Sequence, residues 1–165
     1  GQGVRATSSF GLGASEYLYV IHGLERGVPE PLDLEAERNL HRLLVELANR
    51  RLVQSMHDLS EGGFAVALAE CALGHGVGAT VDLPAEVIAP RPDATLFGEL
   101  QTRVIISAQP ENAEAIRQLA ATHGLACYTI GETGGDRVRI ALNGQEYVNL
   151  ALAECHAAYE GALLG

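Results

Sequence analysis

Residues 55–70 read SMHDLSEGGFAVALAE, a stretch that passes from apolar to polar and back to apolar. Residues 52–56 predict a short buried strand, and residues 57–63 predict a polar turn that ends in two glycines. A strand that leads through a turn into a helix is typical of an α/β fold. The helix is predicted from apolar residues that share one face, namely Phe64, Ala67, Leu68 and Cys71.

A second amphipathic helix is predicted just before this stretch. Asp33 suits a helix N-cap, because its carboxylate can accept hydrogen bonds from the free amides of a first turn. The apolar spacing that follows predicts a helix to about Arg51. Its apolar positions are Leu40, Leu43, Leu44 and Leu47.

Strands and helices alternate through the rest of the chain. Residues 84–95 predict a proline-rich connection, and a helix is predicted from Pro110 to His123. Asn143-Gly144 is a strong signal for a two-residue hairpin turn, and an alanine-rich helix is predicted over residues 151–163. The remaining strands are predicted at residues 79–83, 103–108, 125–130 and 137–142.

This order of elements predicts an α/β (α+β) fold with a mixed β-sheet packed with helices. Strands joined through a helix favour right-handed crossovers, and the hairpin adds antiparallel pairing. A length of 165 residues suits one domain. We place it at residues 16–165, behind a lead-in segment of residues 1–15 that is rich in Gly, Ser and Thr.

Composition excludes several classes of function. The chain has 11 basic and 21 acidic residues and a net charge of -10, which argues against a nucleic-acid partner. It contains no lysine, so a P-loop and Schiff-base chemistry are excluded. No apolar run approaches the roughly 20 residues of a membrane span. The three widely spaced cysteines favour a reduced, cytoplasmic protein.

The turn at residues 57–63 is the candidate binding site. Glycines allow a ligand to approach the backbone closely, and a following helix offers free amides and a positive dipole end to a phosphate or carboxylate. The alternative is that a side chain merely caps the helix, and the negative charges in the turn would oppose an anion. The candidate residues are His57, Asp58, Ser60, Glu61, Gly62 and Gly63.

Glu99, Gln101 and Arg103 form a possible ligand crevice, and the alternative is that they lie on a solvated edge. Two of these, Gln101 and Arg103, are two residues apart on a predicted strand, so both should point to one face. No catalytic residue and no metal site are expected. Cys71 and His75 lack a second pair of ligands, and neighbours such as His57 and Ser60 rarely form a hydrolase triad.

Several stretches together resemble the last domain of the phosphoribosylformylglycinamidine synthase family. Besides residues 55–70, the resemblance rests on GLGASEYL at residues 11–18 and LFGELQTRVIIS at residues 96–107. A longer stretch at residues 111–140 resembles the family's next helix, strand and hairpin. The resemblance covers nearly all of residues 11–163, in order, and it implies a fold similar to the C-terminal domain of aminoimidazole ribonucleotide synthetase.

The resemblance implies that this chain is a fragment of a longer ATP- and Mg²⁺-dependent ligase of purine biosynthesis. That enzyme phosphorylates the formamide oxygen of formylglycinamide ribonucleotide, and ammonia then displaces phosphate. The implied partners are upstream ATP-binding domains of the same chain, a glutaminase subunit and a small partner subunit. The fragment alone is expected to be inactive, and no cofactor is certain for it.

Two alternatives to this interpretation stay open. A related synthetase of the same superfamily, such as aminoimidazole ribonucleotide synthetase, would share the fold. A packing module between domains or subunits would bind no nucleotide.

The family's substrate-contacting Glu-Ser-Gln belongs to another repeat, and here Leu100 stands between Glu99 and Gln101 in place of serine. We also expect Gly63→Leu to disturb docking more than stability.

Overall fold

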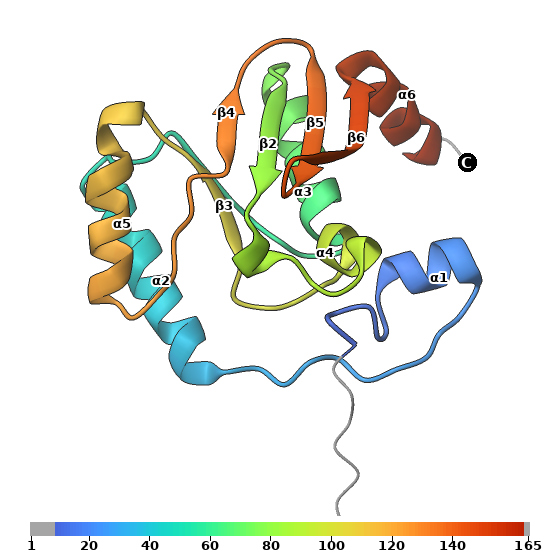
Figure 1. The fold of residues 1–165 in the computed structure, drawn as a ribbon, viewed down its shortest axis with the longest axis horizontal. Helices are drawn as coiled ribbons and strands as arrows, with labels where there is room; N and C mark the ends of the chain where they lie inside the picture. Colours follow the sequence, from blue (N-terminus) through green and yellow to red (C-terminus); the bar gives the residue numbers. More distant parts are fainter. Residues whose placement is uncertain (1–8, 164–165) are drawn as a thin grey trace, which may run out of the picture.

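The computed structural model describes residues 9–163, which form a mixed α/β structure (Figure 1). The α-helices are α1 (Glu16–His22), α2 (Leu34–Asn49), α3 (Gly63–His75), α4 (Pro92–Phe97), α5 (Ala113–Thr122) and α6 (Leu152–Leu163). The strands are β1 (Ser55–Asp58), β2 (Ala79–Leu83), β3 (Val104–Ser107), β4 (Gly131–Thr133), β5 (Arg137–Leu142) and β6 (Gln145–Ala151). The short 3-10 turns η1 (Ala85–Val87) and η2 (Pro110–Asn112) precede α4 and α5.

The larger sheet is mixed, with strand order β4-β2-β5-β6. Strands β2 and β5 are parallel at its centre, and β4 and β6 pair antiparallel at its edges. The turn between β5 and β6 lies at Asn143 and Gly144, which have φ angles of 49° and 82°. Positive φ at both turn residues is what an Asn-Gly hairpin requires, so this prediction is confirmed.

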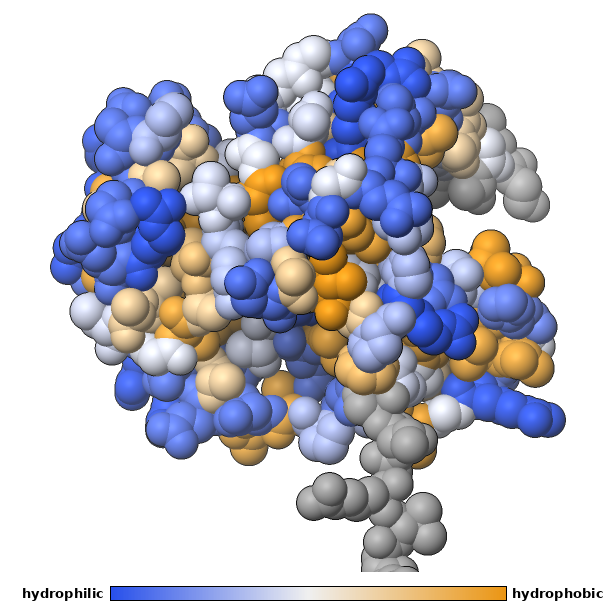
Figure 2. Space-filling view, viewed as in Figure 1, coloured by the Kyte–Doolittle hydropathy of each residue, from blue (hydrophilic) through white to orange (hydrophobic). Residues whose placement is uncertain are grey.

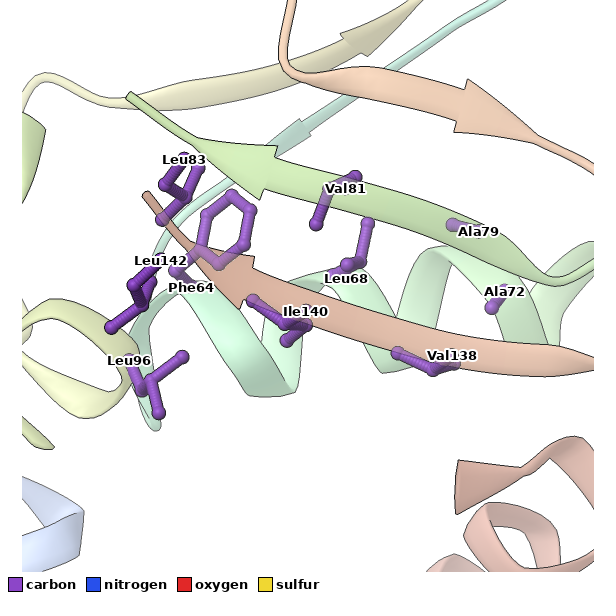
Figure 3. Close-up of a cluster of buried hydrophobic side chains, with 10 residues drawn as sticks. All are labelled: Phe64, Leu68, Ala72, Ala79, Val81, Leu83, Leu96, Val138, Ile140 and Leu142. Atoms are coloured by element: carbon purple, nitrogen blue, oxygen red, sulfur yellow. The ribbon is translucent and has the colours of Figure 1, made fainter. Parts of the chain in front are cut away.

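Helix α3 packs its apolar face against the centre of this sheet (Figure 3). Val138 and Ile140 of β5 are 1% and 0% exposed, and they share one buried cluster with Phe64 and Leu68 of α3. Leu96 closes the cluster from α4. Of the predicted apolar face of α3, Phe64 and Leu68 belong to the main core cluster, whereas Ala67 and Cys71 lie outside it.

A two-stranded antiparallel ladder, β1 with β3, lies between this core and a second one. The second core joins α2 to α5 through Leu43, Leu47, Ile116 and Ala120. Neighbouring side chains of β3 serve both cores, because Ile105 packs against the first cluster and Ile106 against the second. Alternation along the strand thus places β1 and the turn that follows it between the two halves of the fold.

The structure corrects the expected strand pairing. The helix-linked strands β1 and β2 do not pair with each other, and β1 pairs with β3 in a separate sheet. Residues 125–130 form no ladder, and β4 begins only at Gly131. Leu125 and Cys127 instead pack against the α2–α5 cluster, and only Ile130 at the end of the segment reaches the sheet, where its carbonyl accepts the amide of Asp82 at 2.7 Å.

Helix boundaries differ less from prediction. Asp33 is the N-cap of α2, and its carboxylate accepts the amides of Glu35 and Ala36 at 3.0 Å each. The connection predicted over residues 84–95 contains part of α4, whose first residue is Pro92. Within residues 9–163 no helix combines the length and apolarity needed to cross a membrane.

Candidate functional site

The glycine turn connects β1 to α3 through two residues in the left-handed region. Gly62 and Gly63 have φ angles of 77° and 66°, which L side chains adopt only with strain. A Cβ atom on Gly63 would lie 2.7 Å from the carbonyl carbon of Phe97. The close approach that Gly63 permits is therefore to the backbone of the segment after α4.

Glu99 supplies the negative charge at the start of α3. One of its carboxylate oxygens, Oε1, accepts the amide of Gly62 at 2.9 Å and the amide of Glu16 at 2.9 Å. Both amides stand at helix N-termini, where a carboxylate is favoured by the free N–H groups and the helix dipole. The amide of Gly63 donates to the carbonyl of Ser60 at 3.2 Å. Both glycine amides of the turn are thus bonded within the chain.

The polar side chains of the turn interact mainly with one another. The Ser60 hydroxyl donates to Asp58 Oδ2, and this hydrogen bond holds the pKa of Asp58 below its ordinary value. His57 places Nδ1 2.6 Å from the carbonyl oxygen of Asp58, and its Nε2 lies 3.5 Å from Glu70. Glu61 is exposed. Ser60 bonds to Asp58 and not to His57, so this is no hydrolase triad.

Arg103 anchors the loop that carries Glu99. Its Nε donates to the carbonyl of Leu100 at 3.2 Å, and its Nη2 donates to the carbonyl of Gly98 at 2.5 Å. Burial lowers the pKa of the Arg103 guanidinium from its ordinary value. The strand prediction at 103 was one residue early, because β3 begins at Val104. The two crevice residues Gln101 and Arg103 therefore lie in the loop before the strand.

A cavity of about 380 Å³ brings part of the predicted site together. Asp58 and Leu59 from the turn meet Gln101 and Arg103 from the loop, and Leu40 belongs to the α2 wall. Leucines of α2 give the cavity an apolar part, and polar side chains enter it from the turn, from the loop and from α2 itself. Asp58, Gln101 and Arg103, which are far apart in sequence, thus line one hollow.

Sequence reasoning missed the polar residues that α2 contributes to this cavity. Glu37 accepts a hydrogen bond from the Thr102 hydroxyl at 2.6 Å, and its other oxygen lies 2.9 Å from Nε2 of His41. Spacing by four residues places Glu37 and His41 on one helix face. The sequence contained this spacing of four, but it could not show that Thr102 lies against the helix face that carries Glu37 and His41.

The described residues offer little to a metal ion. Across residues 9–163 no group of three or more His, Cys, Asp or Glu side chains is arranged to hold one. Cys71, Cys127 and Cys155 are free thiols that are each partly buried. Burial raises the pKa of Cys71 and Cys127, which disfavours the thiolate form that a metal would need.

Comparison with known proteins gives consistent matches. The family model "AIR synthase related protein, C-terminal domain" matches residues 1–143. Phosphoribosylformylglycinamidine synthase subunit PurL from Moorella thermoacetica is 41% identical over 143 residues, which is 87% of this chain and 19% of that protein. The chain therefore spans about a fifth of the length of the curated relatives it matches.

Solved structures with the same fold come from Thermotoga maritima. PurL complexed with FGAR and PurL complexed with ATP match with TM-scores of 0.68 and 0.69, each at 23% identity. These matches cover 79% and 78% of this chain, and 22% and 23% of the longer chains. The structure of PurLQS matches with a TM-score of 0.67 at 20% identity, over 85% of this chain and 24% of that one.

Proposed function

Because the chain belongs to the AIR synthase related protein C-terminal domain family, we propose that it is the C-terminal domain of a phosphoribosylformylglycinamidine synthase. The observation that carries this proposal is the 41% identity to a PurL subunit over 87% of the chain. Residues 16–165 would be that domain and residues 1–15 the segment that enters it. The full-length ligase would act in the cytoplasm, in purine biosynthesis.

In that reaction ATP supplies a phosphoryl group to the formamide oxygen of formylglycinamide ribonucleotide, and ammonia then displaces phosphate to leave the amidine. Phosphorylation matters because an amide oxygen is a poor leaving group. The cavity offers the carboxylates of Glu37 and Asp58, and across residues 9–163 no cluster of three metal-ligand side chains is present. Mg²⁺ at this wall would therefore need phosphate oxygens and waters as further ligands, and the catalytic groups would belong to the rest of the longer chain.

The role of this chain would be to form one wall of the ligand cleft. Asp58, Gln101 and Arg103 line the same cavity and present a carboxylate, an amide and a guanidinium to it. Such groups bind and orient a polar ligand. The turn residues His57, Ser60 and Glu61, with Gly62 and Gly63, would border the same wall. Glu99 would hold the turn in place within this wall, because its carboxylate accepts the hydrogen bond of the Gly62 amide.

The proposed partners follow from the same family. They are upstream ATP-binding domains of one longer chain, a glutaminase subunit that supplies ammonia and a small partner subunit. A PurLQS structure among the fold matches supports an assembly of this kind. The net charge of -10 supports neither a nucleic-acid nor an anionic membrane partner.

A second candidate function is a packing module that contacts no nucleotide. It is favoured by the hydrogen bond between the Gly62 amide and Glu99, which uses inside the domain a donor that a phosphate would need. This candidate predicts that the domain supports its neighbours without touching the ligand. A related synthetase, such as aminoimidazole ribonucleotide synthetase, would share the family but not the substrate.

A chimeric enzyme tests the proposal. The matching C-terminal part of the Moorella thermoacetica PurL subunit is replaced by this chain, and amidine formation is measured with its partner subunits. We expect activity to be retained, and Arg103→Met in the chimera to raise the KM for formylglycinamide ribonucleotide. A folded chimera without activity would contradict the synthase assignment. An unchanged KM in the Arg103 variant would favour the packing module.

A further inference from the structure

Residues 9–31 form a strap that is bonded mainly to itself. The Ser9 amide donates to Glu30 at 2.8 Å, and the Ala14 amide donates to the carbonyl of Arg26 at 2.8 Å. These bonds join the beginning of the strap to its end and enclose α1. Figure 1 shows the strap beside the body of the domain, joined to α2 by an extended connection.

The strap buries little of itself. No residue of α1 is buried, and Val20 and Ile21 are 69% and 60% exposed. Figure 2 shows hydrophobic surface gathered at the right, over the region of α1. A segment with little buried apolar area gains little from the hydrophobic effect, so its attachment depends on a small number of specific contacts.

The specific contacts described between strap and body concentrate on the segment from Phe97 to Glu99. The Tyr17 ring stacks on the Phe97 ring, with centroids 4.8 Å apart and planes 7° from parallel. The Glu99 amide donates to the carbonyl of Gly11 at 2.9 Å. The Glu99 carboxylate accepts the amide of Glu16. One short segment of the body therefore holds both the first residues of the strap and the start of α1.

The same carboxylate oxygen links this attachment to the glycine turn. Oε1 of Glu99 is shared by the amides of Glu16 in the strap and Gly62 in the turn. Arg103 fixes the loop around it, because its guanidinium bonds the carbonyls on either side, those of Gly98 and Leu100. If Glu99 moved, its hydrogen bonds to the Glu16 amide in the strap and to the Gly62 amide in the turn would weaken together.

We propose that Glu99 is a latch through which the strap, residues 9–31, opens from the domain as one unit and through which that opening is coupled to the glycine turn. In the closed state the latch ties the start of α1 to the start of α3. In the open state the Glu16 amide leaves Oε1 of Glu99, and the carboxylate that holds the Gly62 amide becomes free to move. The proposal concerns this chain alone and does not depend on the synthase assignment.

Amide hydrogen exchange of the 165-residue chain tests whether the strap opens as one unit, because exchange through local opening and exchange through global unfolding respond differently to denaturant. Exchange is followed by NMR at increasing, sub-denaturing urea. We expect the amides of Ala14, Glu16 and Gly62 to exchange through an opening that is nearly independent of urea. The amides of β2 and β5 should exchange only through global unfolding. Equal urea dependence in strap and sheet would overturn the proposal.

Two substitutions test the latch itself. Glu99→Ala removes the shared acceptor, and we expect exchange at Glu16 and Gly62 to accelerate about tenfold or more, since two hydrogen bonds are lost. The matched control is Glu154→Ala, because Glu154 likewise accepts a backbone amide, that of Ala151, next to the start of α6. The control should accelerate exchange near α6 and leave the strap unchanged.

Tyr17→Ala provides a test that leaves Glu99 in place. It removes the ring stack on Phe97, and we expect the strap amides and the Gly62 amide to accelerate together, by several-fold. Acceleration in the strap with no change at Gly62 would show that the two ends are not coupled and would overturn the proposal. Unchanged exchange of the strap in both Glu99→Ala and Tyr17→Ala would overturn it as well.

Discussion

His123 at the end of α5 donates a hydrogen bond from Nε2 to the Glu46 carboxylate of α2, across a distance of 3.0 Å. This bond lies beside the second core, where Leu47 and Ala120 pack together. It is the chief reason that the pKa of Glu46 lies below its ordinary value of 4.5, and Arg50 adds to the effect. The charge of one carboxylate therefore adds to the contact that the apolar core makes between the two helices.

The first prediction is a loss of stability in acid that Glu46 partly causes. A carboxyl whose pKa is depressed by folding contributes stability above its unfolded pKa, and this contribution is lost as pH falls through the folded value. We expect the melting temperature to fall from about pH 5 downwards, and to fall less steeply in Glu46→Gln. Thermal unfolding between about pH 6 and pH 3 measures this. The exposed Glu86→Gln serves as control, and equal slopes in all three proteins would disprove the role of Glu46.

The second prediction reverses our expectation for Gly63→Leu. Gly63 has a φ of 66°, and its side-chain direction meets the backbone of Phe97 at 2.7 Å and of Gly98 at 2.8 Å. Backbone strain and a clash with main-chain atoms each cost about 1–3 kcal/mol. We therefore expect Gly63→Leu to lower the free energy of unfolding by roughly 2–5 kcal/mol, in place of an effect on docking alone.

Urea denaturation of Gly63→Leu measures this loss, and Gly74→Ala is the matched control. Gly74 lies in the same helix without a positive φ, and a Cβ there would meet nothing within 4 Å. Alanine in a helix is favoured over glycine by about 1 kcal/mol, so the control should be unchanged or slightly more stable. A Gly63→Leu protein as stable as the wild type would show that the backbone moves freely at this turn.

The sequence predicted those elements whose signal is local. The Asp33 cap, the leucine stripe of α2 and the Asn143-Gly144 turn each depend on residues within a few positions of one another, and all are confirmed. Strand pairing depends on contacts across the chain. Residues 125–130 were predicted as a strand, but the apolar side chains of Leu125 and Cys127 pack against the helix pair. A short apolar run indicates an extended backbone and does not identify the element that covers it.

The site shows the same division between local and distant information. The turn and its two glycines were visible in the sequence, because adjacent glycines in a polar stretch after a strand are typical of a tight turn. What bonds to the turn was not visible, since Glu99 lies 37 residues beyond Gly62. The Glu99 carboxylate was expected in a ligand crevice, and in the structure it accepts the Gly62 amide at the start of α3. Binding by residues 57–63 therefore stays a prediction.

The third prediction concerns the main core. Ile140 is 0% exposed on the central strand β5 and packs against α3. Ile140→Val should cost about 0.5–1.5 kcal/mol of unfolding free energy, and Ile140→Ala about 2–5 kcal/mol, because a cavity adds to the lost burial. Chemical denaturation of both variants measures this gradation. Val20→Ala in the exposed face of α1 should change stability by less than about 0.5 kcal/mol, and a comparable loss there would contradict the assignment of the core.

The last prediction separates the charge of Arg103 from its hydrogen bonds. Its guanidinium bonds two carbonyls of one loop, and lysine cannot reproduce that fork with a single ammonium group. We expect Arg103→Lys to lower the free energy of unfolding by about 1–3 kcal/mol, close to the effect of Arg103→Met, because in both variants buried carbonyls lose their donor. Denaturation of the two variants beside Arg139→Met, which removes an exposed arginine from β5, measures this. If Arg103→Lys matched the wild type while Arg103→Met did not, positive charge rather than fork geometry would hold the loop, and Glu99 would then be placed by attraction to that charge.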